Sequence, residues 1–235
     1  MIRIAMFSGP RNISTAMMRA FGARPDTRVF DEPFYGCYLA STGADHPMRD
    51  EILAAWPTDQ SDAVARLKRP ADAGETFSFE KHIAFHFAQD ENLDWLAGSR
   101  IFHLIRDPRS MVASYARKFD DVSPITQSYR VQRAIDERFG PGPVVDADDV
   151  LARPEKTLQK LCAALDVPFK PEMLSWPAGP RAEDGPWAPH WYDAVSKSTG
   201  FGAPTPPPAQ LSARLEEAAS RCMDDYAYFR SRRLH

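Results

Sequence analysis

A segment near the start of the chain combines residue types that bind an anion. It reads Ser8-Gly9-Pro10-Arg11-Asn12-Ile13-Ser14-Thr15 and lies between an apolar run and a helical pattern. The start of a helix offers unpaired backbone amides and a positive dipole end to an anion. Arg11 adds a full charge, and the hydroxyls of Ser14 and Thr15 add hydrogen-bond donors. The segment predicts a phosphate-sized site, and a capped strand–helix turn with a solvated arginine is the alternative.

A second segment of the same character lies further along the chain. Arg106 follows an apolar run, at the position where α/β sheets bind ligands. Asp107 and Pro108 are typical of a helix N-cap and first turn, and Ser114 follows two turns into that helix. Its hydroxyl would share an anion with Arg106, unless Arg106 pairs with a carboxylate such as Asp107. Two such sites predict a ligand with phosphate-like groups at both ends of an adenosine.

Two other kinds of site find less support. The first segment lacks the GxxxxGK[ST] pattern of a Walker A loop, and it lacks the lysine of that loop. His82 and His86 have a spacing that metal sites use, but the glutamate of an HExxH motif is missing and no third ligand is evident. No metal is therefore expected.

The elements that must position these segments alternate between strand and helix. Short apolar runs predict strands over residues 2–7, 28–30, 76–80, 100–105 and 143–145. Helical patterns cover residues 14–21, 48–68, 93–97, 109–119, 126–139 and 154–165. This alternation predicts a three-layer α/β/α fold with a central parallel sheet.

The chain, residues 1–235, is expected to form a single domain, because this length suffices for one sizeable core. Ten of the 21 prolines fall within residues 168–208, a region that also holds three tryptophans. So many tryptophans indicate an ordered wrap over the sheet edge rather than a disordered tail. Residues 211–230 predict a terminal amphipathic helix.

Composition excludes several functional classes. The net charge of −3 argues against binding nucleic acid through bulk charge. No apolar run reaches the roughly 18 residues of a membrane helix, and the N-terminus has no signal-peptide layout. Cys37, Cys162 and Cys222 are far apart and fit reduced thiols. We expect a cytoplasmic protein without nucleic-acid or membrane partners, and the oligomeric state stays open.

Three stretches of the sequence resemble the P-loop-like sulfotransferases, which use 3′-phosphoadenosine 5′-phosphosulfate (PAPS). Residues 8–15 resemble their 5′-phosphosulfate loop in its arginine-bearing form. Residues 106–115 resemble their 3′-phosphate motif, and this match is the more specific. Residues 148–158 are similar to the stretch after their last core strand, and the whole resemblance runs from residue 2 to about 200. It implies that PAPS is bound by Arg11, Asn12, Ile13, Ser14, Thr15, Arg106 and Ser114.

The sequence departs from the family pattern at two places. Ile13 replaces the usual glycine of the first loop, which restricts the approach of an anion to the backbone. No Arg-Lys-Gly triplet precedes Gly185, and Arg181 is the nearest candidate for this PAPS-binding closing segment. These departures keep open a catalytically silent module that binds PAPS or another nucleotide.

The resemblance implies two candidates for the base that takes the acceptor's proton. Glu32 follows the second strand and resembles the carboxylate base of bacterial and carbohydrate-type members. His82 follows the third strand and resembles the lysine–histidine pairing of cytosolic members. Imidazole has the better intrinsic pKa near neutrality, while a glutamate needs its pKa raised by burial. We favour Glu32, because the arginine-type loop accompanies the carboxylate-type members; either side chain has a purely structural role as its alternative.

The implied activity is sulfuryl transfer from PAPS to a hydroxyl or amine of a small-molecule acceptor. Arg11, with Ser14 and Thr15, would stabilise the charge on the sulfuryl and leaving oxygens. The alternatives are the silent module and, less favoured, a P-loop kinase using Mg-ATP. Residues 35–75 are expected to form the acceptor pocket, with an aromatic lining of Phe34, Tyr35, Tyr38 and Trp56.

Overall fold

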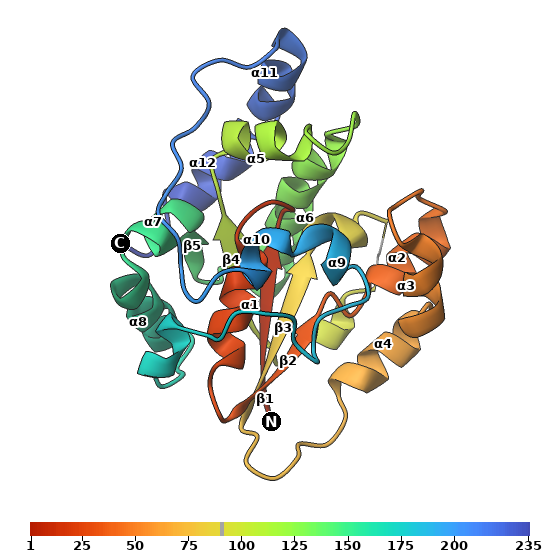
Figure 1. Cartoon of the computed structure of the whole chain (residues 1–235), viewed down its shortest axis with the longest axis vertical. Helices are drawn as coiled ribbons and strands as arrows, with labels where there is room; N and C mark the ends of the chain where they lie inside the picture. Colours follow the sequence, from red (N-terminus) through yellow and green to blue (C-terminus); the bar gives the residue numbers. More distant parts are fainter. Residues whose placement is uncertain (90–91) are drawn as a thin grey trace.

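A five-stranded sheet forms the centre of the structure, a computed structural model in which residues 1–89 and 92–235 are described (Figure 1). The strands are β1 (Ile2–Ser8), β2 (Thr27–Asp31), β3 (Phe77–Ile83), β4 (Arg100–Ile105) and β5 (Val144–Asp146). Their order is β2-β3-β1-β4-β5, and every neighbouring pair is parallel. All five predicted strands are present, at bounds within a few residues of those expected.

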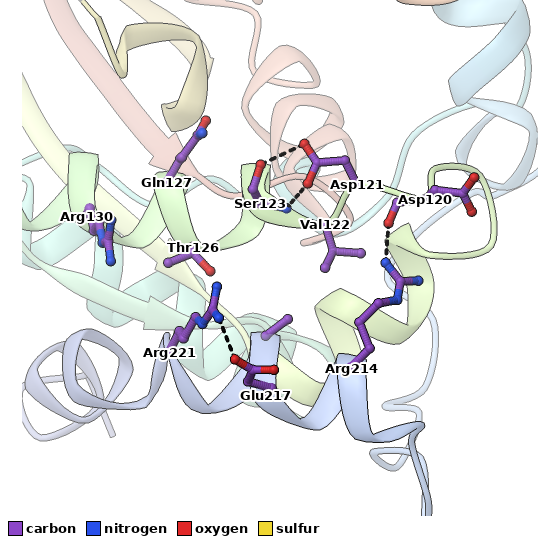
Figure 2. A pocket seen from close by; sticks show the side chains of 11 residues that line it. Asp120, Asp121, Val122, Ser123, Thr126, Gln127, Arg130, Arg214, Glu217 and Arg221 are labelled. Atoms are coloured by element: carbon purple, nitrogen blue, oxygen red, sulfur yellow. Dashed lines mark hydrogen bonds and ion pairs between the residues drawn. The ribbon is translucent and has the colours of Figure 1, made fainter.

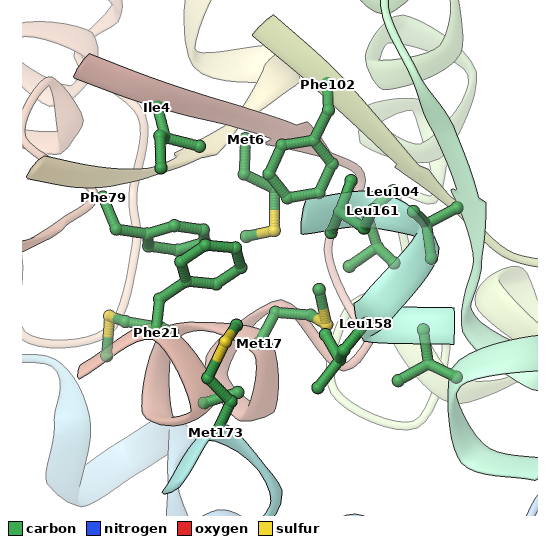
Figure 3. Packing of buried hydrophobic residues seen from close by; sticks show 14 of the residues in the cluster. Ile4, Met6, Met17, Phe21, Phe79, Phe102, Leu104, Leu158, Leu161 and Met173 are labelled. Carbon is green, nitrogen blue, oxygen red and sulfur yellow. The ribbon is translucent and has the colours of Figure 1, made fainter. Parts of the chain in front are cut away.

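Helices cover both faces of the sheet, which confirms the predicted three-layer α/β/α fold. Side chains alternate along β1, so Ile4 and Met6 pack in one cluster, with α1 (Ser14–Gly22) and α8 (Pro154–Ala164), while Ala5 and Phe7 pack in another. Figure 3 shows the first cluster, which is built from aromatic, aliphatic and methionine side chains of the sheet and of the helices packed on this face. Burial on both faces explains why the strands read as nearly continuous apolar runs.

The second cluster lies on the opposite face of the sheet. Its helices are α4 (Gln60–Leu67) and α6 (Ser123–Phe139), which contribute Ala63, Leu67 and Ile135. The remaining helical elements are α2 (Tyr35–Thr42), α3 (Arg49–Ala55), α5 (Pro108–Tyr115), α7 (Ala147–Ala152), α9 (Ala188–Trp191), α10 (Asp193–Ser196), α11 (Ala213–Ser220), α12 (Met223–Arg230) and the 3₁₀ helices η1 (Ala84–Phe87), η2 (Asp94–Leu96) and η3 (Pro171–Leu174).

Two predicted helices are each broken into two. The pattern over residues 48–68 becomes α3 and α4, and Pro57 lies in the break, because proline cannot continue the backbone hydrogen bonds of a helix. The single terminal helix expected over residues 211–230 is instead α11 and α12. α11 packs on α5 and α6, whereas α12 packs on α6, β4 and β5, so the chain changes direction at the buried Cys222.

Residues 168–208 cross the carboxyl edge of the sheet and are held there by buried polar contacts. Both terminal nitrogens of Arg19 on α1 donate to the carboxylate of Asp184, at 2.6 and 2.8 Å. The Gly185 amide donates to Asp31 Oδ2, at the end of β2, over 3.0 Å. These contacts place α9 and α10 over the strand ends (Figure 1). Within the described ranges, no helix is long and apolar enough to cross a membrane.

Candidate active site

A cavity of about 450 Å³ opens at the carboxyl edge of the sheet. The loops after β1, β2 and β4 line it together with the end of β3 and residues of α9 and α10. Eight predicted site residues belong to its lining: Arg11, Asn12, Ile13, Ser14, Thr15, Glu32, Arg106 and Ser114. Both anion-binding segments and one candidate base therefore meet, because the carboxyl ends of parallel strands share one edge.

The first segment forms an open helix start. Ile13 is the N-cap of α1 with φ 44°, and no side chain in the described part of the chain caps the helix there. The first helical hydrogen bond runs from Met17 N to Ile13 O at 3.1 Å, so the amides before residue 17 are not used within the helix. Asn12 has a positioning role, because its Nδ2 donates to Leu104 O on β4 over 2.7 Å. The loop is thus fixed with free amides at the cavity.

Two arginines contact Ser114, and a third contacts the backbone of the loop after β1. Arg11 Nε and a terminal nitrogen of Arg117 each donate to Ser114 Oγ over 3.1 Å, and Arg106 donates to Arg11 O over 3.1 Å. Burial and the neighbouring cations Arg117 and Arg106 lower the pKa of Arg11. In residues 1–89 and 92–235, no carboxylate lies within salt-bridge distance of these three guanidinium groups. This arginine cluster (Arg11, Arg106 and Arg117) therefore has an excess of positive charge that an anionic ligand would balance.

Arg106 does not pair with Asp107, which was the structural alternative for this motif. The Asp107 carboxylate instead accepts a hydrogen bond from Ser110 N at 3.0 Å and caps α5, as the sequence predicted. Arg106 Nε is buried and has no partner among the described residues. A buried donor without a partner costs free energy, which a bound anion would recover.

Glu32 is held at the cavity by a strained backbone. Its φ is 40°, its amide donates to Lys81 O at 3.0 Å, and its carbonyl accepts from Trp56 Nε1 at 3.2 Å. Arg11 (φ 63°) and Ile13 (φ 44°) share this left-handed conformation, which is rare for residues other than glycine. Strained residues of this kind cluster at functional sites, where the surrounding structure holds them in place.

Lys81 connects Glu32 to a buried polar network. Its Nζ donates to Glu32 Oε1 at 2.5 Å, to Asp31 Oδ1 at 2.8 Å and to the Tyr192 hydroxyl at 2.6 Å. Burial alone would lower the pKa of Lys81, but the carboxylates of Asp31 and Glu32 raise it well above its ordinary value. Burial raises the pKa of Glu32 to about 7, against the opposing attraction of Lys81. A carboxylate with this pKa suits a general base near neutral pH.

The structure does not bring His82 or Arg181 to the cavity, contrary to expectation. Side chains alternate along β3, so Lys81 points to the cavity and His82 to the opposite face of the sheet. The His82 ring stacks on Phe7 with centroids 4.8 Å apart, and its Nε2 lies 3.3 Å from Glu80 Oε2. Arg181 is outside the cavity lining and donates to Pro177 O over 2.6 Å. Neither residue is therefore placed to act on a ligand in this cavity.

The aromatic lining also differs from the expected one. Of the four aromatic residues expected to line the acceptor pocket, only Tyr35 lines this cavity, while Phe34 and Tyr38 line a neighbouring one of about 680 Å³. Trp56 packs on Trp187 with ring centroids 5.1 Å apart. Sequence reasoning missed several lining residues: Lys81, His46, Phe85, Tyr115, Trp191 and Tyr192. Of these residues, only Lys81 could have been found from the sequence. It lies in an apolar strand next to His82, and neighbouring side chains of a strand point to opposite faces of the sheet.

Another cavity, of about 340 Å³, lies between the start of α6 and α11 (Figure 2). Its charged side chains mostly bind one another or the backbone: Arg221 donates to Glu217 at 2.5 Å, and Arg214 donates to Asp120 O. It contains none of the predicted site residues. No group of three or more His, Cys, Asp or Glu side chains suited to a metal occurs in the described residues. That the protein needs no metal stays a prediction.

Comparison with known proteins agrees with this geometry. A sequence model of the sulfotransferase domain matches residues 2–232. The chain belongs to the sulfotransferase domain family. Branched-chain-amino-acid aminotransferase-like proteins 1 and 2 of Arabidopsis thaliana are 33% and 32% identical to this sulfotransferase domain, over 99% of the chain. The alignments cover 42% of each plant protein, so the chain spans about two-fifths of the length of these relatives.

Solved structures show the same fold. The sulfotransferase domain of the Synechococcus PCC 7002 olefin synthase superposes with a TM-score of 0.57 at 18% identity, covering 93% of both chains. A sulfotransferase from Alicyclobacillus acidocaldarius superposes with a TM-score of 0.56 at 14% identity, covering 98% of this chain and 95% of the other. The P-loop-like sulfotransferase fold implied by the sequence motifs is thereby confirmed.

Proposed function

We propose that this sulfotransferase domain transfers a sulfuryl group from PAPS to a hydroxyl or amine of a small molecule, with Glu32 as the base. The observation that carries the proposal is the arginine cluster next to the open start of α1. Helix starts and arginine side chains both bind phosphate-like groups. Two such elements at one cavity suit a donor that carries anionic groups on both its 3′ and 5′ positions.

The proposed reaction is an in-line displacement at sulfur. The acceptor oxygen forms a bond to sulfur while the bond from sulfur to the bridging phosphate oxygen breaks. The acceptor's proton passes to Glu32, and the electron pair leaves with 3′-phosphoadenosine 5′-phosphate (PAP). Residues 11–15 hold the 5′ end, where Arg11 stabilises the charge on the leaving oxygen. Arg106 and Ser114 hold the 3′-phosphate, and Lys81 fixes the Glu32 carboxylate.

A thermal-shift comparison of PAP, adenosine 5′-monophosphate and Mg-ATP tests the identity of the ligand. A ligand that binds only the folded state stabilises it by about 2.7 kcal/mol at one hundred times its Kd. We expect PAP to raise Tm at a much lower concentration than the other two nucleotides. A larger shift with Mg-ATP than with PAP would instead favour a kinase or nucleotide hydrolase.

Arg106→Ala and Ser114→Ala are expected to weaken the binding of PAP more than that of adenosine 5′-phosphosulfate, which has no 3′-phosphate. Losing a charge-assisted hydrogen bond costs about 1.5–3 kcal/mol, or one to two decades in affinity. Calorimetric titration of both ligands measures the difference. Arg109→Ala is the matched control, because Arg109 lies on the same helix but pairs with Glu216 at 2.6 Å. Equal losses for both ligands would place the 3′-phosphate elsewhere.

The pH dependence of kcat/KM should report the raised pKa of Glu32. The base must be deprotonated, so kcat/KM is expected to rise with pH and level off above about 7, the pKa of Glu32 in the free protein. Below that value it should fall about tenfold for each pH unit. A profile that is flat between pH 5 and pH 8 would remove Glu32 as the titrating base.

A further inference from the structure

Aromatic rings line part of the cavity in an almost continuous layer. The rings of Tyr35 and His86 stack with centroids 4.5 Å apart, and those of Phe85 and His86 lie 4.6 Å apart. Phe119 is not itself a lining residue, but its ring packs on three rings that are. Its centroid lies 4.9 Å from that of Tyr115, 5.5 Å from that of Trp191 and 5.7 Å from that of His46. We call the six lining residues the aromatic wall: Tyr35, His46, Phe85, His86, Tyr115 and Trp191.

The aromatic wall is uncharged near neutral pH. Burial lowers the pKa of His46. Burial, helped by repulsion from His46 and Lys81, also holds the pKa of His86 well below its ordinary value. Burial also raises the pKa values of Tyr35 and Tyr115. Both histidines are therefore neutral and both tyrosines stay protonated. An anionic group placed against these rings would lose its hydration without gaining a counter-ion.

The charged groups beside the aromatic wall already have partners within the protein. Lys81 is bound to Asp31 and Glu32, and all three side chains are buried. Lys118 is outside the cavity lining; its Nζ donates to His190 O at 3.0 Å and lies 4.5 Å from the centroid of the Trp191 ring. The excess positive charge of the cavity belongs to the arginine cluster, where the proposed function places the donor.

Glu32 lies next to the aromatic wall. Its Oε1 is bound to Lys81, while its Oε2 is 4.0 Å from His86 Nδ1 in the wall. An acceptor whose hydroxyl reaches Glu32 can therefore place its remaining atoms against the aromatic rings. The loop of residues 11–15 lines the same cavity, and the proposed function places the sulfuryl group at this loop.

We propose that the aromatic wall is the acceptor subsite and selects uncharged alcohols or phenols that carry an aromatic ring. This inference rests on the proposed function and narrows its acceptor class, because it disfavours acids. An aromatic acceptor ring gains binding free energy from stacking on these rings, in addition to the free energy gained from buried apolar area. The stacking contribution corresponds to roughly a twofold to tenfold increase in affinity. The desolvation of an unpaired charge adds a larger penalty against anionic acceptors.

Two matched pairs of acceptors test the proposal with the intact protein and PAPS. Benzyl alcohol and cyclohexylmethanol present the same type of hydroxyl and differ in the aromaticity of the ring. 4-Hydroxyphenylacetamide and 4-hydroxyphenylacetate share their phenol and differ in charge. We expect kcat/KM to favour the first member of each pair, by at least about threefold for the ring and about tenfold for the charge. Equal or reversed preferences would overturn the proposal.

A variant of the aromatic wall tests whether the wall causes the preference for an aromatic acceptor ring. Trp191→Leu should reduce the preference for benzyl alcohol over cyclohexylmethanol toward unity, and Trp191 is only half-buried, so the fold should tolerate the change. Phe139→Leu is the matched control, because it removes a half-buried ring that is outside this cavity. An unchanged preference in Trp191→Leu, with PAP binding intact, would contradict the assignment.

The outcomes separate this inference from the proposed function. Failure of PAP to raise Tm would count against the proposed function itself. Normal PAP binding with sulfation of charged or saturated acceptors alone would leave the function in place and overturn the role of the wall. Normal PAP binding with no turnover of any of the four acceptors would likewise overturn the proposed acceptor class.

Discussion

Glu32→Gln is expected to lower turnover by a factor of about 10²–10⁴ at saturating PAPS, because it removes the proton acceptor. Glutamine keeps the shape of the side chain, and its amide oxygen still accepts a hydrogen bond from Lys81. Lys81 also keeps its ion pair with Asp31, over 2.8 Å, so the fold should persist. Steady-state rates, combined with a PAP-induced thermal shift as a check on folding, measure the effect.

His82→Gln is the informative comparison for this experiment. His82 is buried on the opposite face of β3, where it contacts Glu80 and Phe7 rather than the cavity. Its substitution should therefore change turnover per folded molecule much less than Glu32→Gln and leave the pH profile in place. If His82→Gln were the slower variant, and alone lost the low-pH limb, the histidine would be the base and the assignment would be wrong.

Arg11→Ala is expected to lower turnover by about 10²–10³ while changing the affinity for PAP much less. Its guanidinium is proposed to act on charge that develops as the sulfur–oxygen bond breaks, and removing such a donor typically costs this much. PAP would keep the amides at the start of α1 and its contact with Arg106. Turnover is measured with saturating PAPS and affinity by titration with PAP.

The same experiment has a clear contrary outcome. Arg109→Ala is the matched control, because Arg109 pairs with Glu216 at 2.6 Å and lies outside the cavity lining. Turnover of Arg11→Ala within about threefold of the parent, or equal losses in both variants, would exclude a specific role for Arg11 in the chemical step.

The sequence predicted those parts of the site that depend on local signals. The five strands are short apolar runs, and Arg11 and Arg106 each follow one of them, so their meeting at one edge follows from a parallel sheet. The alternation rule, which places Lys81 and His82 on opposite faces of the sheet, was also available. The sequence does not show which face of the sheet carries the site, however, so alternation alone does not decide between Lys81 and His82.

Other parts of the site depend on contacts between distant segments. Tyr192 lies 111 residues from Lys81 in the chain but accepts its hydrogen bond, and no local pattern marks such a pair. The raised pKa of Glu32 likewise depends on its burial in the folded chain, and the ion pair with Lys81, 49 residues away in the sequence, opposes that rise. Arg181 was placed in the site by its spacing from Gly185, but the buried pair of Arg19 and Asp184 fixes this segment in another orientation.

The most direct test of the central claim follows the sulfuryl group itself. The protein is incubated with ³⁵S-labelled PAPS and benzyl alcohol, and labelled sulfate ester and PAP are quantified together. The account predicts that ester and PAP form in equal amounts, and that Glu32→Gln slows both by the same factor while still binding PAP. Tight binding of PAP without any labelled ester, from benzyl alcohol or from a wider set of hydroxyl and amine acceptors, would contradict it and identify a nucleotide-binding module that does not catalyse transfer.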